Sequence, residues 1–423
     1  QSTFVGFDLA AQPLAAGREL AERARLKNIT LAQQDLMAVT GEIGRFDYVI
    51  AHGFYAWVPP AVQDKLLALC REVLAPEGVA YVSYNAYPGC RIRELFRDIM
   101  LAQGRGTEEP SARIEAAKSA IDFVRRNLPG AADYGSWMLD EMEKLVRQDP
   151  GALYHDTLGE VYSPCTFLEF MRRAGGHGLQ YLGEAEFLEM NDEPFSPEAV
   201  ERLRAFGPDR ILEKEQLMDF LKMRSFRQTL LCRDSVALRR TPASEDLGRF
   251  HVSTRARAVS PSAKPGAVEY RTPKGATMVT ESPVFQRLMA RLEKAWPGSL
   301  PFPELVGLCG DAAAAAQLVV RMYGMAIVDL HPAPPRFARQ PGATPAVSPL
   351  VRLQIERSPL VTNRLHADVR IDGDAARELV RRLDGRRSRA TLLRDLASAG
   401  TPLAPEALEA GLQQLAQLAL LTE

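Results

Sequence analysis

The sequence predicts an α/β protein with a central parallel sheet, followed by two small α+β modules. Three observations support this. Near-continuous apolar strands alternate with helical patterns over the first hundred residues, which is typical of parallel strands covered by helices on both faces. Residues 91–155 then read as wholly helical. After residue 241 the chain changes to short alternating runs and a proline-rich linker.

The totals describe an ordinary globular protein. The chain has 423 residues, 46% apolar and 25% charged, with a formal net charge of −1. That length predicts two to four domains, and the near-zero charge gives no general attraction to nucleic acid or anionic membranes. The five cysteines are far apart in the chain and form no metal-ligand spacing, so we expect a reducing, cytoplasmic protein without a metal. No apolar run approaches the length of a membrane span, so we expect no membrane insertion.

The first half divides into a sheet domain and a helical insertion. Strands are expected at residues 4–7, 29–33, 46–51, 79–84, 179–182 and 229–232. Helices are expected at residues 12–26, 63–74, 166–174 and 196–224. We therefore expect a sheet domain in residues 1–103 and 161–240, interrupted by an insertion at 104–160. A fold rarely begins on a central strand, so we also expect residues upstream of Gln1.

The second half predicts two similar modules. A hairpin within 251–282 precedes helices at 283–295 and 311–322 and a strand at 326–330. After the linker, helices at 375–383, 389–397 and 405–416 precede a strand at 419–422. This order predicts winged-helix-like modules at 241–340 and 341–423.

A cluster of arginines in the last module raises the alternative of nucleic-acid binding. Acidic side chains are mixed with it, so we favour an ordinary solvated helix face and expect no nucleic-acid partner. The cluster and its acidic neighbours are Arg381, Arg382, Arg386, Arg387, Arg389, Glu378, Asp384 and Asp395.

Acidic and amide side chains follow the predicted strands. Asp8 ends the first strand, Asp35 follows the second, and Asn85 follows the strand at 79–84. Ligands of open parallel sheets bind beyond the carboxyl ends of the strands. There one carboxylate can accept hydrogen bonds from ribose hydroxyls, and another can accept one from the adenine amine. The alternative is that both aspartates are turn residues or helix caps.

Bulky aromatic side chains follow the strand at 46–51, in the stretch FDYVIAHGFYAWVPP. Tyr55 and Trp57 lie there, and Tyr84 and Tyr87 lie near the end of the strand at 79–84. They could pack in the core or line a pocket, and for each single aromatic we hold both readings open.

Several motifs resemble a known family. FVGFDLA, QQDLM, FDYVIAHG and LCREVLAPEGVAYVSY are similar to motifs of class I S-adenosylmethionine-dependent methyltransferases. HGFYAWVP, SYNAYPG, YHDTLGEVYSPCTFLEFMRRAGGHGLQYLGEAEF and FRQTLLC resemble a narrower group, the bacterial proteins with a methyltransferase regulatory domain. That group includes the rickettsial outer-membrane-protein lysine methyltransferases. The resemblance covers roughly residues 1–235.

The resemblance implies a Rossmann-like sheet that is N-terminally incomplete here, because the first strand and its glycine loop are absent from the sequence. It also implies S-adenosylmethionine as cofactor and a homodimer formed through the helical insertion. Asp8 and Leu9 would lie at the ribose, and Asp35 and Leu36 at the adenine. Ala51 and His52 would lie near the methionine end of the cofactor.

Methyl transfer to an amine needs an aligned nitrogen lone pair and exclusion of water. Aromatic faces suit a lysine stem and a cationic sulfonium, so we expect the four tyrosine and tryptophan side chains named above to form a channel for a lysine of a protein substrate. Asn85 could hold the amine, and His52, Tyr55 and Asn85 are the candidates for a catalytic role. The alternatives are a small-molecule methyltransferase and a scaffold protein that kept the fold and lost its chemistry.

Overall fold

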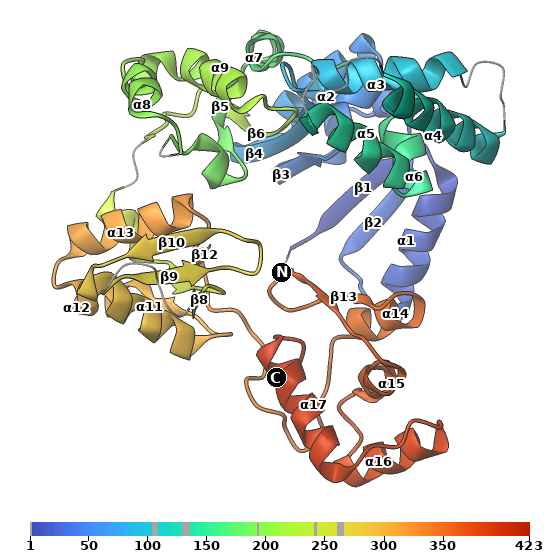
Figure 1. Cartoon of the computed structure of the whole chain (residues 1–423), viewed down its shortest axis with the longest axis vertical. Helices are drawn as coiled ribbons and strands as arrows, with labels where there is room; N and C mark the ends of the chain where they lie inside the picture. The colour runs from blue at the N-terminus through green and yellow to red at the C-terminus, as the bar shows by residue number, and fades with distance from the viewer. Residues whose placement is uncertain (1, 104–108, 129–135, 193, 241–242, 260–265) are drawn as a thin grey trace. The chain divides into compact units, whose positions relative to one another are not determined.

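The structure is a computed structural model that describes residues 2–423 except 104–108, 129–135, 193, 241–242 and 260–265 (Figure 1). The chain forms two compact units. One consists of residues 36–240, and the other of residues 1–35 together with 241–423. Each unit is described by itself below.

The unit of residues 36–240 is built on a four-stranded sheet of order β3-β4-β6-β5. Its strands are β3 (Phe46–Ala51), β4 (Leu74–Asn85), β5 (Leu179–Glu184) and β6 (Phe226–Arg233). β3 pairs with β4 in parallel, whereas β6 lies antiparallel to both β4 and β5. The β3–β4 pair agrees with the predicted parallel sheet, and β6 departs from it because this strand enters between β4 and β5 from the opposite end.

Helices α2 (Pro60–Val73) and α7 (Phe167–Gly176) pack against one face of this sheet (Figure 1). Ala80, Val82 and Tyr84 alternate along β4 and are buried on that face. The opposite face is open at β3, where Tyr48 and Ile50 are each 72% exposed. The expectation that helices cover both faces is therefore wrong for this part of the described chain.

Four helices after β4 form a block with its own apolar core. They are α3 (Cys90–Gln103), α4 (Pro110–Asn127), α5 (Ser136–Arg147) and α6 (Pro150–Asp156). Ile121 is buried in this core, and Val124 and Leu145 pack against it. These apolar positions are therefore satisfied within the chain and do not by themselves require a partner.

Two helices complete the unit before β6. They are α8 (Pro197–Arg204) and α9 (Ile211–Lys222), with a short turn of 3-10 helix between them. The continuous helix expected over 196–224 is thus broken, because Gly207 has a φ of 67° and Pro208 follows it.

The N-terminal part of the second unit is a strand–helix–strand element. β1 (Phe4–Asp8) and β2 (Ile29–Gln33) pair in parallel, and α1 (Ala11–Arg23) connects them. The helix ends three residues earlier than predicted, because Arg25 takes a left-handed φ of 57° and turns the chain toward β2.

Residues 243–331 form a small α+β module. Its strands are β7 (His251–Ser253), β8 (Arg257–Val259), β9 (Val268–Arg271), β10 (Thr277–Thr280), β11 (Leu300–Pro301) and β12 (Asp329–His331). Its helices are α10 (Ser244–Leu247), α11 (Pro283–Ala295), α12 (Phe302–Cys309) and α13 (Ala312–Gly324). The strand predicted at 326–330 begins later, because Ala326 takes a φ of 55°. One continuous apolar core joins these elements.

The last module has α14 (Pro349–Arg357), β13 (Leu360–Thr362), β14 (Asp368–Arg370), α15 (Asp374–Arg382), α16 (Arg389–Ser398) and α17 (Pro405–Gln417). The terminal strand predicted at 419–422 is wrong. Only a single bridge joins Leu421 to Val347, because Ala419 takes a φ of 52° and Leu420 and Leu421 pack into the helical core.

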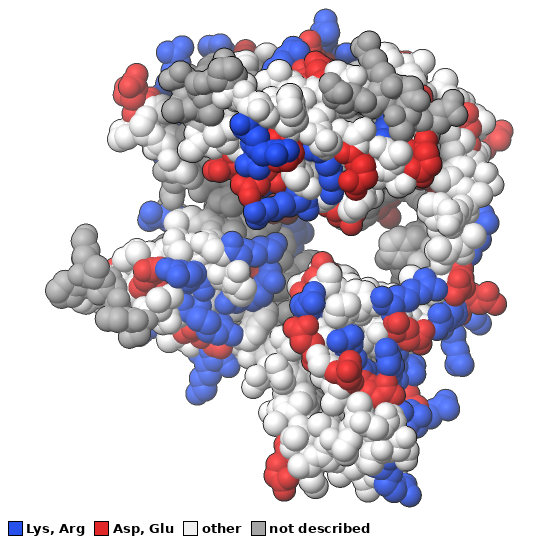
Figure 2. All heavy atoms as spheres, turned by 45° about the vertical axis from the view of Figure 1, so that its right-hand side comes forward, with Lys and Arg blue, Asp and Glu red and all other residues white. Residues whose placement is uncertain are grey.

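The arginine cluster of this module is ion-paired. Arg381 and Arg382 contact Glu378, and Arg387 contacts Asp384 and Asp395. Figure 2 shows acidic and basic side chains interspersed on the face in view. These contacts favour the interpretation of the cluster as an ordinary solvent-exposed helix surface that carries charges of both signs.

No single helix in the described residues is long and apolar enough to cross a membrane, and α12 and α13 meet that criterion only as a pair bent by 114°.

Candidate functional site

The carboxyl end of β3 places His52 in a hydrogen-bond network. Its Nδ1 lies 3.0 Å from the hydroxyl of Tyr81 and 3.1 Å from that of Ser83. The Tyr81 hydroxyl donates to Oε1 of Gln228 at 2.9 Å, so its oxygen can accept from Nδ1–H of His52. In the neutral ring, Nε2 then carries the lone pair. His52 is exposed and therefore remains a candidate proton acceptor.

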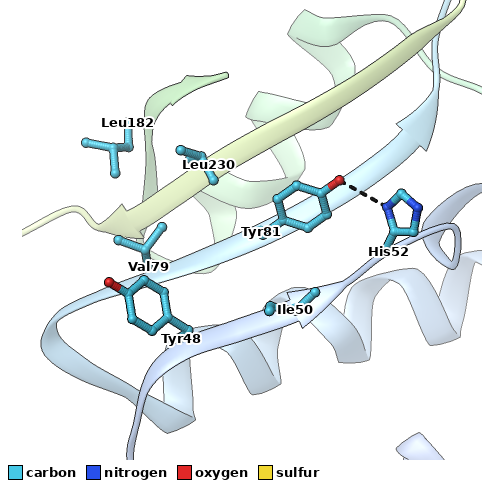
Figure 3. A pocket seen from close by; sticks show the side chains of 7 residues that line it. All are labelled: Tyr48, Ile50, His52, Val79, Tyr81, Leu182 and Leu230. Atoms are coloured by element: carbon cyan, nitrogen blue, oxygen red, sulfur yellow. Dashed lines mark hydrogen bonds between the residues drawn. The ribbon is translucent and has the colours of Figure 1, made fainter. Parts of the chain in front are cut away.

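A hollow of about 500 Å³ lies beside His52 on the open face of the four-stranded sheet (Figure 3). Tyr48 and Ile50 from β3 and Tyr81 from β4 line it, together with apolar side chains of β5 and β6. The hollow is almost wholly apolar, and the polar groups of its lining lie at its two ends, the Tyr48 hydroxyl at one and the His52–Tyr81 pair at the other. It therefore has the character of a packing surface, not of a site for a charged ligand.

The carboxyl end of β4 is held from two sides. Asn85 is buried and pairs with Phe226 of β6, and its carbonyl accepts from the Cys165 N–H at 3.4 Å. The Cys90 thiol beside it donates to the Ser225 carbonyl at 3.0 Å. Asn85 thus lies where the sequence predicted it, and its side chain is buried.

Two of the predicted channel residues belong to the core. Tyr55 is 0% and Tyr84 is 1% exposed, and both rings pack against Phe170, at centroid distances of 5.2 and 4.2 Å. Burial raises the pKa of both phenols, so Tyr55 is unsuited to act as a base near neutral pH. For these two side chains the structure corrects the channel expectation in favour of core packing.

The other two predicted aromatics are half-buried. Trp57 packs against Tyr162 with ring centroids 5.0 Å apart. Tyr87 follows β4 directly and donates its hydroxyl hydrogen to Glu94 of α3 at 2.6 Å. These side chains are accessible at the same end of the sheet as Asn85, so they remain candidates for substrate contact.

Asp8 and Asp35 lie at the carboxyl end of the β1–β2 pair. The parallel register sets Asp8 opposite Gln33, so Asp35 follows two residues beyond it at the carboxyl ends of both strands. Oδ1 of Asp8 accepts from the Ala10 N–H at 2.8 Å, which agrees with the turn reading. Among the described residues, Oδ2 has no hydrogen-bond partner. Both carboxylates are exposed, so the chemistry of this end fits a ligand that offers hydroxyl or amine donors.

The remaining predicted cofactor residues differ in burial. Leu9 is exposed and Leu36 is buried at the start of a 3-10 turn. Ala51, the last residue of β3, is also buried. Any contact of Leu36 or Ala51 with a ligand therefore has to come from the backbone. No cluster of three metal-ligating side chains occurs in the part of the chain that the structure describes.

Sequence reasoning missed three residues around this region. Tyr162 packs against Trp57, and Glu94 accepts the hydroxyl hydrogen of Tyr87. The third residue, Arg227 of β6, is buried and contacts three carboxylates. The motif FRQTLLC places Arg227 in a predicted strand of the sheet, and a charged residue in such a strand was the available signal.

Comparison with protein-family models gives three matches. Residues 1–78 match a methyltransferase domain, residues 149–233 a predicted methyltransferase regulatory domain, and residues 344–402 the C-terminal winged helix domain of PKMT. The regulatory match overlaps the predicted insertion only over 149–160, so most of it covers the elements from α7 to β6.

Among curated proteins, the chain is 33% identical over 250 residues to the uncharacterized protein RP789 of Rickettsia prowazekii. That match covers 59% of this chain and 45% of the relative. The uncharacterized protein RP028 of the same organism is 26% identical over 41% of this chain and 70% of its own length. The uncharacterized protein sll1526 of Synechocystis is 26% identical over 56% of this chain and 47% of its own length. The chain thus spans less than half the length of two of these relatives.

Among solved structures, PKMT2 from Rickettsia typhi superposes with a TM-score of 0.86 at 21% identity, covering 100% of this chain and 90% of that one. A structure of the same protein in complex with AdoHcy gives a TM-score of 0.85 at 22% identity, covering 99% of this chain and 89% of that one. At this identity the likeness establishes the fold. The predicted methyltransferase fold and C-terminal winged helix are therefore confirmed.

The chain thus carries, in this order, segments that match a methyltransferase domain, a predicted methyltransferase regulatory domain and the C-terminal winged helix domain of PKMT, on a fold that it shares with PKMT2 from Rickettsia typhi.

Proposed function

We propose that this chain is an S-adenosylmethionine-dependent methyltransferase that methylates the amine of a lysine in a protein substrate. The observation that carries the proposal is the parallel β1–β2 register, which places the exposed carboxylates of Asp8 and Asp35 at the carboxyl ends of these two strands. The methyltransferase-domain match over residues 1–78 and the AdoHcy complex of the structural neighbour support it.

Bound S-adenosylmethionine supplies a methyl group activated by a positive sulfur. In the proposal, Asp8 accepts hydrogen bonds from ribose hydroxyls through Oδ2, with Leu9 beside it. Asp35 accepts one from the adenine amine. Carboxylate acceptors suit both donors, because hydrogen bonds to charged acceptors are the stronger ones. The cofactor roles of Leu36, Ala51 and His52 stay predictions from the resemblance.

The acceptor side of the proposal rests on the half-buried aromatics. Trp57 offers its accessible ring surface to an aliphatic stem that ends in a cation. One face of Tyr87 is covered by Arg91, so Tyr87 contributes through its hydroxyl. A protein substrate agrees with the PKMT name of the matched winged helix domain. A cytoplasmic location and a homodimer formed through the helical block belong to the same proposal.

The test is calorimetric titration of S-adenosylmethionine into the 423-residue chain and into Asp8→Asn. We expect micromolar binding that weakens at least about tenfold in the variant, the equivalent of ~1.4 kcal/mol. Asp47→Asn, an exposed aspartate on β3, is the matched control and should bind like the parent.

Activity is tested by mass spectrometry of bacterial proteins incubated with the chain and deuterated S-adenosylmethionine. Labelled methyl groups on lysines support the proposal. Label found only in small molecules would favour the small-molecule alternative. Absence of both binding and label contradicts an enzyme and leaves the scaffold reading.

A further inference from the structure

Three side chains at the start of α3 form a closed triangle. The Tyr87 hydroxyl donates to Oε1 of Glu94 at 2.6 Å, and Nη1 of Arg91 lies 3.2 Å from Oε2. The Arg91 guanidinium carbon lies 3.7 Å from the centre of the Tyr87 ring. Each residue contacts the other two, so the tyrosine is fixed at its hydroxyl and at its ring face.

The backbone fixes the same tyrosine. Tyr87 N–H donates to the Cys165 carbonyl at 3.1 Å, and Gly89 N–H donates to the Arg224 carbonyl at 2.9 Å. A Cβ at position 89 would lie 2.3 Å from the Met223 carbonyl oxygen, so only glycine permits this approach. The turn that carries Tyr87 is thus held against two other segments of the unit.

We propose that Glu94 is a positioning residue that orients the Tyr87 hydroxyl as a hydrogen-bond acceptor for the substrate amine. The inference rests on the function proposed above and adds a determinant of substrate specificity to it. Glu94 takes the hydroxyl hydrogen, so the oxygen lone pairs of Tyr87 are left for an incoming N–H donor. An amine that donates to Tyr87 has its own lone pair directed away from the tyrosine, where the methyl group can be received.

Electrostatics favour an amine at this position. The carboxylate of Glu94 acts on Tyr87 and on the neighbouring Tyr162. Burial and the hydrogen bond to Glu94 raise the pKa of Tyr87, so the phenol keeps its proton and remains a neutral acceptor. The Arg91 guanidinium offsets much of the Glu94 charge at this position. The preference for an N–H donor therefore comes from the lone pairs of the neutral Tyr87 oxygen.

Packing alone is the competing explanation. The Arg91–Glu94 pair is an exposed i,i+3 pair, and such pairs contribute little to stability. The short bond from Tyr87 to Glu94 is charge-assisted. Loss of the Glu94 charge should therefore affect amine positioning more than folding.

The experiment compares Glu94→Ala, which removes the acceptor of the Tyr87 hydroxyl hydrogen, with Tyr87→Phe, the double variant and the parent chain. The substrate is a lysine peptide whose methylation the mass-spectrometric experiment above detects. We expect each single variant to lower kcat/KM for the peptide about 10- to 100-fold, the range of a hydrogen bond to a charged group. The double variant should be no worse than Tyr87→Phe alone, because Glu94 acts through that hydroxyl. S-adenosylmethionine affinity and Tm should stay unchanged.

Asp98→Asn, on the exposed side of the same helix, is the control and should keep full activity. The inference is overturned if Glu94→Ala retains kcat/KM within twofold, or if its effect multiplies with that of Tyr87→Phe. A loss of activity that follows a lowered Tm also overturns it, in favour of packing. A parent chain that transfers no methyl group refutes the proposed function itself, which separates the two failures.

Discussion

Nη1 of Arg227 donates to Oε1 of Glu184 across 2.6 Å, and both side chains are buried at the heart of the four-stranded sheet. Asp219 and Glu215 of α9 contact the same guanidinium. The Thr229 hydroxyl connects this group to Tyr84, because it donates to Oε1 of Glu184 at 2.9 Å and its oxygen, 3.3 Å from the Tyr84 hydroxyl, can accept the hydrogen of that phenol. The buried charges thus support the aromatic core beneath the carboxyl end of β4.

Arg227→Met should destabilise the chain strongly. The substitution removes the positive charge that three buried carboxylates contact. Removing one partner of a buried ion pair costs about 3–5 kcal/mol of stability. Urea unfolding followed by circular dichroism measures the change. Arg202→Met, on the exposed face of α8, is the control and should shift the free energy of unfolding by less than about 0.5 kcal/mol. Equal stability of the two variants would show that the charge network is dispensable.

Tyr84→Ala and Trp57→Ala should separate stability from turnover. Tyr84 is wholly buried, and truncating a large buried aromatic costs about 3–5 kcal/mol. Trp57 is half-buried, so its truncation should lower Tm less and methyl transfer more. The two measurements are thermal unfolding and the rate with saturating S-adenosylmethionine. Unchanged turnover in Trp57→Ala would exclude this side chain from the acceptor site.

The module of residues 243–331 should lose stability below neutral pH through His331. Its Nε2 lies 2.8 Å from the Ser253 hydroxyl, and its neighbours are Asp329 and His251. Burial lowers the pKa of His331 below 6.5, although Asp329 opposes the shift. Between the lowered pKa and 6.5 the unfolded chain binds more protons, so the stability that is present above pH 6.5 declines as the pH falls.

His331→Asn should remove this contribution. We expect the difference in unfolding free energy between the parent and His331→Asn to be larger at pH 7.5 than at pH 5. His366→Asn is the matched control, because His366 is exposed and asparagine tolerates its φ of 56°. A pH-independent difference for His331 would contradict the assignment.

Dimerisation through the helical block would require an exposed apolar contact. Phe123 on α4 is 62% exposed, whereas Ile121 is buried within the block. If the proposed homodimer uses this helix, Phe123→Glu should shift the mass measured by light scattering from two chains toward one. A monomeric parent chain would contradict the dimer.

The sequence predicted the parts of the fold that depend on local pattern. The strands at 29–33 and 46–51 agree with β2 and β3, and the helix at 283–295 agrees with α11. Each is a continuous apolar or periodic segment, and a Ser282 cap marks the start of α11. Helix α14 was missed because its starting proline, Pro349, lies in a stretch that reads as linker, although proline is favoured at a helix start.

Features that depend on long-range pairing could not be predicted. The residues of β6 carry no signal for its direction in the sheet, so its antiparallel entry was missed. The positions of Asp8 and Asp35 followed from strand ends, which the apolar pattern marks. The role of Glu94 depends on where α3 begins relative to Tyr87, and burial of Tyr55 depends on the packing of Phe170 from a segment over a hundred residues away.

The hydrogen bonds of Ala86 and Tyr87 set a limit on how this chain can be shortened. Ala86 N–H donates to the Ser225 carbonyl, and Tyr87 N–H donates to that of Cys165. Both acceptors lie inside the segment matched as regulatory, residues 149–233. A fragment cut before residue 149 would leave β4 with a bare edge and unpaired backbone donors, which promotes aggregation. The segment of residues 149–233 and the strand β4 therefore form one structural unit, and domain exchange between relatives has to transfer both together.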